Sequence, residues 1–296
     1  KIMMAFAFIL LGLMGQALAT KQPTRENIIW TVTEDFDSIS PASSTEGEFH
    51  NFTMTGNYIS TGRPYSAFVA TFPPSRFAFY PSAVDGCTAL IQPHISSNET
   101  YNCEYATNGA FFTWDYTAPS LCIGNLVSDN KVWQLPTDGT GTMRANFGIA
   151  SDGSILTGFM SQDTIDKTSW NQLITGYGWL VRNGVSNVQS SQDLGGFDDP
   201  GSFVNEKAPR TAVGVFKNGT MILLEIDGEE DIEAGPDLYE VAELFTTLGA
   251  ESAVNIDGGG SSVSVYEGAV IDYPTCNDTP EMCERAVANI ACVKKA

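Results

Sequence analysis

Residues 211–226 read TAVGVFKNGTMILLEI and determine the fold class of this chain. Two apolar, β-prone runs flank Asn218-Gly219, a pair that favours a tight hairpin turn of the primed type. Further along, apolar side chains recur at helical spacing over residues 237–248, and Gly249 supplies a stop signal. Residues 252–256 then form another apolar run. A hairpin, a helix and a strand in this order predict a crossover packed on a sheet.

Strand-like runs also lie outside this segment, at residues 52–58, 67–72, 76–80, 146–150, 155–160 and 178–182. A second hairpin turn is indicated by SDGS at residues 151–154. We predict an α+β fold with a strand-rich, mixed-sheet core and a few flanking helices, in one disulfide-stapled domain. This domain is expected over residues 50–296, because residues 20–49 are polar and interrupted and indicate an N-terminal arm or pro-segment.

The composition excludes several classes of protein. A chain of 296 residues that is 43% hydrophobic and 17% charged has enough apolar surface for a large core, so intrinsic disorder is excluded. Its 35 acidic and 15 basic residues give a formal net charge of −20. Such a charge repels phosphate backbones, so nucleic acid is not an expected partner.

The N-terminal segment has the pattern of an export signal. Lys1 precedes an apolar run that ends near Met14, and the small-residue triplet Ala17-Leu18-Ala19 follows. This pattern predicts a signal peptide over residues 1–19 and a destination in the lumen of the secretory pathway, Golgi or lysosomal, or outside the cell. No later run approaches the roughly 20 apolar residues of a membrane span, so we expect a soluble product without one.

The cysteines and sequons fit export. An even number of cysteines in an oxidising compartment favours disulfides, and three early and three late cysteines require at least one bridge between the two groups if all are paired. Zinc is the weaker interpretation, because only two histidines and no Cys-x-x-Cys motif occur. The cysteines are Cys87, Cys103, Cys122, Cys276, Cys283 and Cys292, and the glycosylation sequons are at Asn51, Asn98, Asn218 and Asn277.

The segment NIDGGGSS at residues 255–262 is the strongest candidate for a site. Three consecutive glycines at the end of a strand let backbone amides approach a ligand closely, and such a concavity suits an anion. The alternative is a tight turn between strands. No Lys-Ser/Thr pair follows the glycines, so a nucleotide-binding P-loop is not indicated. Asp257 would lie at the rim of the concavity.

Three further segments carry candidate groups. Amides and carboxylates among aromatic residues are suited to sugars, and this pattern selects Asn108, Gly109, Asn125 and Asp129, with ordinary core and turns as the alternative. Arg210 begins an otherwise apolar strand, where its guanidinium could bind a phosphate or carboxylate or form a structural ion pair. Asp227 at a strand end is either a turn residue or a catalytic carboxylate.

Other kinds of catalytic site lack support. There is no Gly-x-Ser-x-Gly elbow and no His-Glu-x-x-His motif, and two histidines give little basis for a triad. Carboxylates, amides and an arginine without histidine indicate chemistry on sugars or phosphates. We expect no cofactor and no catalytic metal.

Several segments in consistent order resemble the phosphodiester glycosidases over about residues 50–295. They include NGAFF (108–112), CIGNLVSD (122–129), NFGIASDGSILTGFMS (146–161), GWLVRNG (178–184) and NIDGGGS (255–261). The resemblance implies a hydrolase that removes N-acetylglucosamine from GlcNAc-α-1-phospho-6-mannose diesters on phosphorylated high-mannose glycans of glycoproteins, which exposes mannose 6-phosphate. It also implies the disulfides Cys87–Cys122, Cys103–Cys292 and Cys276–Cys283.

The chemistry implied by this resemblance assigns roles to the candidates. Asp257 is the favoured base or nucleophile, with Asp227 as the second carboxylate. Arg210 and the amides of Gly258, Gly259 and Gly260 would bind the departing phosphate, with Ser261 as a further donor. Asn108, Gly109, Asn125 and Asp129 would hold the sugar. The alternatives are a glycosidase for another sugar-1-phosphate diester and a non-catalytic glycan-binding protein of the same fold.

Overall fold

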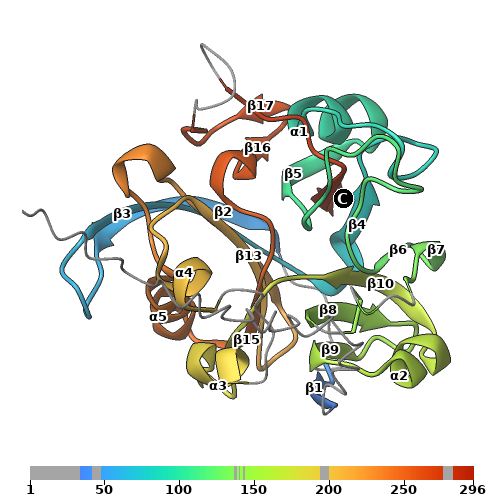
Figure 1. The fold of residues 1–296 in the computed structure, drawn as a ribbon, viewed down its shortest axis with the longest axis horizontal. Coiled ribbons are helices and arrows are strands. Elements are labelled where there is room, and N and C mark those ends of the chain that lie inside the picture. The colour runs from blue at the N-terminus through green and yellow to red at the C-terminus, as the bar shows by residue number, and fades with distance from the viewer. Residues whose placement is uncertain are drawn as a thin grey trace, which may run out of the picture. The chain divides into compact units, whose positions relative to one another are not determined.

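The computed structural model describes residues 34–41, 48–136, 139, 141–142, 144–193, 200–275 and 283–296. They belong to one compact unit, residues 32–296, which contains three β-sheets and a few short helices (Figure 1). The strand-rich α+β fold is therefore confirmed, and the described strand pairs are all antiparallel where mixed sheets were expected. The predicted signal peptide lies outside the described residues. In the described part of the chain, no helix is long and apolar enough to cross a membrane.

The seven-stranded sheet contains the crossover that the sequence predicts. Strand β14 leads through α5 (Leu238–Leu248) to β15, and β13 lies between these two strands, antiparallel to both. Helix α5 begins after the N-cap Asp237 and ends at Gly249, whose φ of 87° is left-handed. In order across the sheet, the strands are β12 (Val185–Ser186), β11 (Trp179–Arg182), β15 (Ala250–Asn255), β13 (Arg210–Phe216), β14 (Met221–Ile226), β3 (Pro64–Phe72) and β2 (His50–Asn57).

The six-stranded sheet includes part of the expected arm. Strand β1 lies within residues 20–49, yet it pairs with β9 along its full length. Arg182 of β11 forms ion pairs with Asp35 and Asp37 of β1, so charge compensates for the small number of apolar residues in this strand. The strands in order are β1 (Asp35–Ile39), β9 (Ile155–Phe159), β8 (Ala145–Ala150), β10 (Trp170–Thr175), β6 (Leu126–Ser128) and β7 (Lys131–Gln134).

The five-stranded sheet joins distant parts of the chain. The last strand of the chain, β18, lies between β5 and β4, and Cys292 of β18 forms a disulfide with Cys103 of β5. A second disulfide joins Cys87 to Cys122. Both are pairs that the family resemblance implies. The strands in order are β17 (Ala269–Val270), β16 (Ser264–Tyr266), β5 (Cys103–Asn108), β18 (Asn289–Lys294) and β4 (Phe77–Pro81).

The remaining predicted modifications are only partly described. Cys283 is disulfide-bonded, but Cys276, its expected partner, lies outside the described residues. Of the sequon residues, Asn98 and Asn218 are exposed and Asn51 is half-buried on β2, while Asn277 lies outside the described residues.

The three sheets share one hydrophobic core. Phe79 of β4, Phe147 of β8 and Val213 of β13 are fully buried members of a single cluster. Short helices lie at the edges: α1 (Pro93–Ile95), α2 (Gln162–Lys167), α3 (Val188–Asp193) and α4 (Pro200–Asn205). Because each sheet buries a face in this core, loops at the strand ends are held in fixed positions.

Both predicted hairpins form, but the expected primed turn at Asn218-Gly219 is wrong. Phe216 pairs with Thr220 across three intervening residues, and Gly219 alone of the two has a positive φ, 89°. A primed turn of type I′ needs a positive φ at both positions. The 151–154 turn has the same form, with Gly153 at a φ of 88°.

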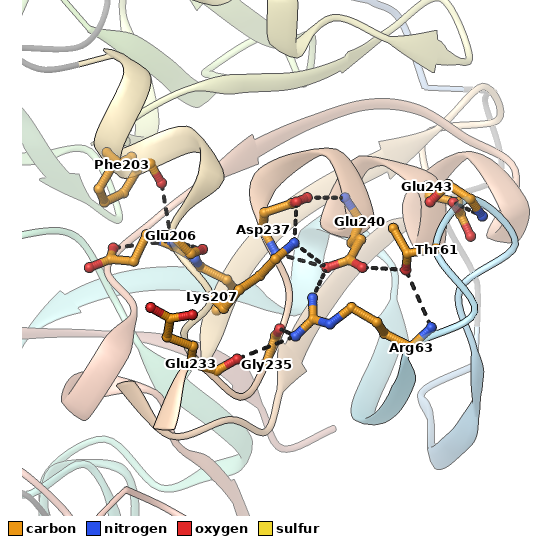
Figure 2. Close-up of polar contacts among 12 residues, drawn as sticks. Thr61, Arg63, Phe203, Glu206, Lys207, Glu233, Gly235, Asp237, Glu240 and Glu243 are labelled. Atoms are coloured by element: carbon orange, nitrogen blue, oxygen red, sulfur yellow. Dashed lines mark hydrogen bonds and ion pairs between the residues drawn. The ribbon is translucent and has the colours of Figure 1, made fainter. Parts of the chain in front are cut away.

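A buried ionic network fixes the start of α5 (Figure 2). The Glu240 carboxylate is 1% exposed and accepts hydrogen bonds from Arg63 at 2.6 Å and from Lys207 at 3.2 Å. It also accepts a hydrogen bond from the Asp237 backbone amide at 3.0 Å, which completes a capping box. Arg63 donates in turn to the Gly235 carbonyl at 2.6 Å. The network therefore joins the β2–β3 hairpin to the loop that precedes α5.

Candidate active site

Residues 257–262, here called the glycine turn, follow β15 and meet the end of β5. The Asp257 amide donates to the Gly109 carbonyl at 3.0 Å. The Asn108 side chain donates to the Asp257 carbonyl at 2.6 Å. Two segments that the sequence analysis selected separately therefore form one site.

Each glycine of the turn allows a close approach by another group. A Cβ on Gly258 would lie 2.9 Å from the Pro209 carbonyl oxygen. The Gly259 backbone has a φ of 57°, and the Glu230 carboxylate occupies the space where its Cβ would be. The Arg285 guanidinium likewise occupies the space where a Cβ of Gly260 would be. The three glycines thus bring a carboxylate and a guanidinium against the main chain.

The turn does not form the open three-amide cradle expected from sequence. The Gly259 amide donates to the Pro209 carbonyl at 2.8 Å, and the Gly258 amide faces the Asp257 carboxylate. A buried amide needs a hydrogen-bond acceptor. The Pro209 carbonyl can come close enough to accept from the Gly259 amide because Gly258 has no side chain. Gly259 therefore does not offer its N–H to an anion.

Asp257 has the electrostatics of an acid–base group. It is 9% exposed, and its pKa is raised to about 6 by burial, with a smaller contribution in the same direction from Glu230. The Ser261 hydroxyl, the Gly258 amide and Arg285 oppose that rise. A carboxyl group in this range can gain and lose a proton near neutral pH.

Arg210 lies beside the glycine turn, but much of its guanidinium binds protein. Its Nη2 donates to the Glu206 carbonyl at 2.9 Å and to the Phe203 carbonyl at 3.2 Å, and it pairs with the Glu206 carboxylate. Burial lowers its pKa, while Glu206 opposes this effect. Among the described residues, no atom accepts its buried Nε–H. The Nε–H of Arg210, which lies beside Gly258, is therefore a donor without an acceptor in the described part of the chain. This is compatible with the phosphate-binding role predicted for Arg210.

Arg285 is a site residue that the sequence analysis missed. Its Nη1 donates to the Ser261 hydroxyl at 3.2 Å, and its charge favours the ionised form of Asp257. The guanidinium also lies 6.0 Å from the ring centroid of Trp114, which is 57% exposed. Arg285 and Trp114 line a pocket of about 550 Å³ together with Leu90, Ile91, Gln92, Ile95, Glu284 and Ala286. Arg285 therefore borders both this pocket and the glycine turn.

An aromatic group, Phe111, Tyr177 and Phe203, lies on another side of the turn. Tyr177 packs edge to face on Phe111 and on Phe203, with centroids 5.6 Å and 4.7 Å apart. Arg210 lies 4.6 Å from the Phe203 ring, which places this group beside the glycine turn. Aromatic rings next to polar groups are typical of sugar sites.

Asp227 lies in a different cluster from Asp257. Its carboxylate oxygen lies within 4.8 Å of ligand oxygens of Glu225 and Asp272, and it accepts the Tyr273 amide at 3.1 Å. The carboxylate that faces the glycine turn beside Asp257 is Glu230, only three residues later in the chain. The turn after β14 directs Glu230 toward Gly259, so the structure does not bring Asp227 together with Asp257.

Asn125 and Asp129 form structural contacts outside the glycine turn. The Asn125 amide donates to the Gly141 carbonyl and to Asn146, both at 2.9 Å. Asp129 accepts from Tyr80 at 2.5 Å and from Gln172 at 2.9 Å. None of these partners belongs to the glycine turn. Sequence alone could not separate them from sugar ligands, because both types of role use short polar side chains at strand ends.

Asn108 and Gly109 are in the site, but neither faces open space. Asn108 is fully buried, accepts from the Thr211 hydroxyl at 2.8 Å and holds the Asp257 carbonyl. A Cβ on Gly109 would overlap the Asn289 side chain. Their geometry therefore supports positioning of Asp257 rather than direct contact with a sugar.

This fold and site define a phosphodiester glycosidase. Residues 101–294 match that family, and the chain belongs to it. Among its relatives, N-acetylglucosamine-1-phosphodiester alpha-N-acetylglucosaminidases of Homo sapiens and Mus musculus are 33% and 34% identical to it over 226 residues. The alignment covers 72% of this chain but 42% of each relative, so the chain matches less than half of their length.

Solved structures agree with this assignment. The zebrafish N-acetylglucosamine-1-phosphodiester alpha-N-acetylglucosaminidase catalytic domain, auto-inhibited by its pro-peptide, superposes with a TM-score of 0.74 at 28% identity and covers 88% of both chains. A hypothetical protein from Synechocystis superposes with a TM-score of 0.61 at 15% identity, which shows the shared fold alone.

Proposed function

We propose that this protein hydrolyses the bond between N-acetylglucosamine and phosphate in GlcNAc-α-1-phospho-6-mannose diesters of glycoproteins, leaving mannose 6-phosphate. The observation that carries the proposal is the buried Asp257, with a pKa of about 6, on a turn that also holds the Arg285 guanidinium. The names of the relatives describe alpha-N-acetylglucosaminidases that act on an N-acetylglucosamine-1-phosphodiester. The predicted signal peptide and sequons support a site of action in the lumen of the secretory pathway.

The proposed reaction is favoured because the leaving group, a phosphate monoester, is a weak base. The C1–O bond to phosphate breaks with its electron pair on the phosphate oxygen, and the departing monoester is a stable anion. Asp257 acts at C1 either as the base that takes a proton from water or as the nucleophile. Glu230 is the second carboxylate of the site. Asn108 acts as a positioning residue through the Asp257 carbonyl.

Two arginines are proposed to stabilise the departing phosphate. Arg285 offers a guanidinium against Gly260 and Ser261, and Arg210 offers its unpartnered Nε–H beside Gly258. The aromatic group and Trp114 provide apolar ring faces for the two sugars.

The test is an assay of purified protein with GlcNAc-α-1-phospho-6-mannose. We expect stoichiometric release of N-acetylglucosamine and mannose 6-phosphate. A glucose-1-phosphate diester serves as the matched competitor. Faster turnover of that competitor would favour the alternative glycosidase, and saturable binding without turnover of either compound would favour the glycan-binding alternative.

The pH dependence of kcat/KM should report Asp257. Because its pKa is raised to about 6 and the ionised form is the proposed active form, kcat/KM should rise about tenfold per pH unit below pH 6 and level off above it. Initial rates between pH 4 and 8 at subsaturating substrate measure this profile. A profile that instead falls through pH 6 would assign Asp257 the role of proton donor.

Replacement of Arg285 should weaken catalysis without unfolding the protein. We expect Arg285→Ala to lower kcat/KM by roughly 10- to 100-fold, because a charged hydrogen-bond donor to the phosphate is lost. Arg285→Lys should recover part of the loss. Lys167→Ala, at an exposed ion pair with Asp163, is the control. Equal rates for Arg285→Ala and this control would remove Arg285 from the site.

A further inference from the structure

Three carboxylates from two sheets converge at a place separate from the glycine turn. Glu225 lies near the C-terminal end of β14, Asp227 follows that strand, and Asp272 follows β17. One carboxylate oxygen from each residue lies within 4.8 Å of the others. Like charges at this spacing repel strongly when water is excluded, so the cluster needs compensation.

Two of the three carboxylates, those of Glu225 and Asp272, are buried and carry oxygens without a hydrogen-bond partner among the described residues. Glu225 is 1% exposed and Asp272 is 9% exposed. No atom in the described part of the chain makes a hydrogen bond of good geometry to Glu225 Oε2 or to either Asp272 carboxylate oxygen. The Ser264 amide faces the Asp272 carboxylate and favours its ionised form. Buried carboxylates are ordinarily paired, hydrogen-bonded or bound to metal, and for these three oxygens of Glu225 and Asp272 the described residues supply neither of the first two.

We propose that Glu225, Asp227 and Asp272 bind a divalent cation, Ca²⁺ by preference. All donors are hard carboxylate oxygens, and the cluster contains no imidazole or thiolate, so zinc and copper are disfavoured. Three carboxylates can offer up to six oxygens to one ion, close to the coordination number of Ca²⁺. Mg²⁺ retains several waters, for which a site with two almost fully buried ligands has little room.

This cation would join two sheets and support the active site indirectly. Its ligands belong to the seven-stranded sheet and to the segment after β17 of the five-stranded sheet. The chain from Asp227 runs directly to Glu229, which accepts the Thr275 hydroxyl at 2.7 Å, and to Glu230 at the glycine turn. Occupancy should therefore fix Glu230 in addition to stabilising the fold. The proposal does not depend on the substrate of the enzyme.

The test uses the full chain stripped with EDTA and then titrated with CaCl₂ in a calorimeter. We expect one tight site per chain, and a melting temperature that rises by roughly 5 °C or more at 100 times the Kd. Glu225→Gln should weaken binding at least roughly tenfold, since even outer contacts of metal sites have effects of this size. Asp163→Asn, at an exposed carboxylate on α2, should leave the affinity unchanged.

Asp272→Asn is the second ligand variant if Glu225→Gln does not fold, and the wild-type titration needs no variant. The proposal is overturned if wild-type protein binds no Ca²⁺ at millimolar concentration and melts at the same temperature with CaCl₂ and with EDTA. It is also overturned if a folded ligand variant binds Ca²⁺ as tightly as the wild type, because the ion would then lie elsewhere.

Discussion

Asp257→Asn should lower kcat by at least about 100-fold, the smallest loss expected when a positioned acid–base group is removed. The amide cannot accept a proton from water and is a poor nucleophile. It has the same size as the carboxylate, and the backbone contacts of residue 257 to Gly109 and Asn108 do not involve the replaced atoms. Steady-state release of N-acetylglucosamine from the phosphodiester measures the effect.

The KM of this variant should change far less than kcat, because Arg285 and the aromatic group remain. Asp163→Asn, the same chemical change at an exposed site, should retain full activity. Unfolding must be excluded by the melting temperature, which should stay at or above that of the wild type near neutral pH, since a buried charge is removed. A folded Asp257→Asn protein with wild-type kcat would refute the role of Asp257.

Glu240→Ala should destabilise the fold by about 3 kcal/mol, at the lower end of the range for removing one partner of a buried ion pair. The replacement leaves Arg63 without its carboxylate partner and leaves Lys207 with Asp237 alone. It also removes half of the capping box of α5. The value is at the lower end because Arg63 and Lys207 are partly exposed and can recover water contacts.

Urea unfolding followed by tryptophan fluorescence measures this free energy. The matched control is Asp163→Ala, which breaks an ion pair whose two side chains are both more than two-thirds exposed. It should change stability by less than about 1 kcal/mol. Similar values for the two variants would show that the network at α5 contributes no more than a surface pair.

Local sequence pattern predicts a part of the elements of the fold. Helix α5 has its cap, its apolar face and its glycine stop within one short segment, and the strands on both sides of the 217–220 turn are mostly apolar. Strand β1 was missed because its polar residues are stabilised by Arg182, which lies far away in the sequence. The hairpin type was wrong because Asn218 can precede a left-handed glycine without adopting that conformation itself.

Only the part of the candidate site that is formed by consecutive residues could be predicted from the sequence. The run Gly258 to Gly260 and the adjacent Asp257 are local features, and they form the centre of the candidate site. Arg285 and Glu230 approach that run through tertiary contacts, and no spacing in the sequence indicates such an approach. The partner of the Gly259 amide is not indicated by the sequence either, because the Pro209 carbonyl that accepts its hydrogen bond is 50 residues away in the chain.

The order of strands in the five-stranded sheet determines when this sheet can be completed during synthesis. Strand β18 lies between β4 and β5, and the disulfide that joins it to β5 spans 189 residues. At typical translation rates this interval takes roughly 10 to 40 s. During that time β4 and β5 expose unpaired edges, so a nascent chain needs chaperones or another temporary cover until its final strand arrives.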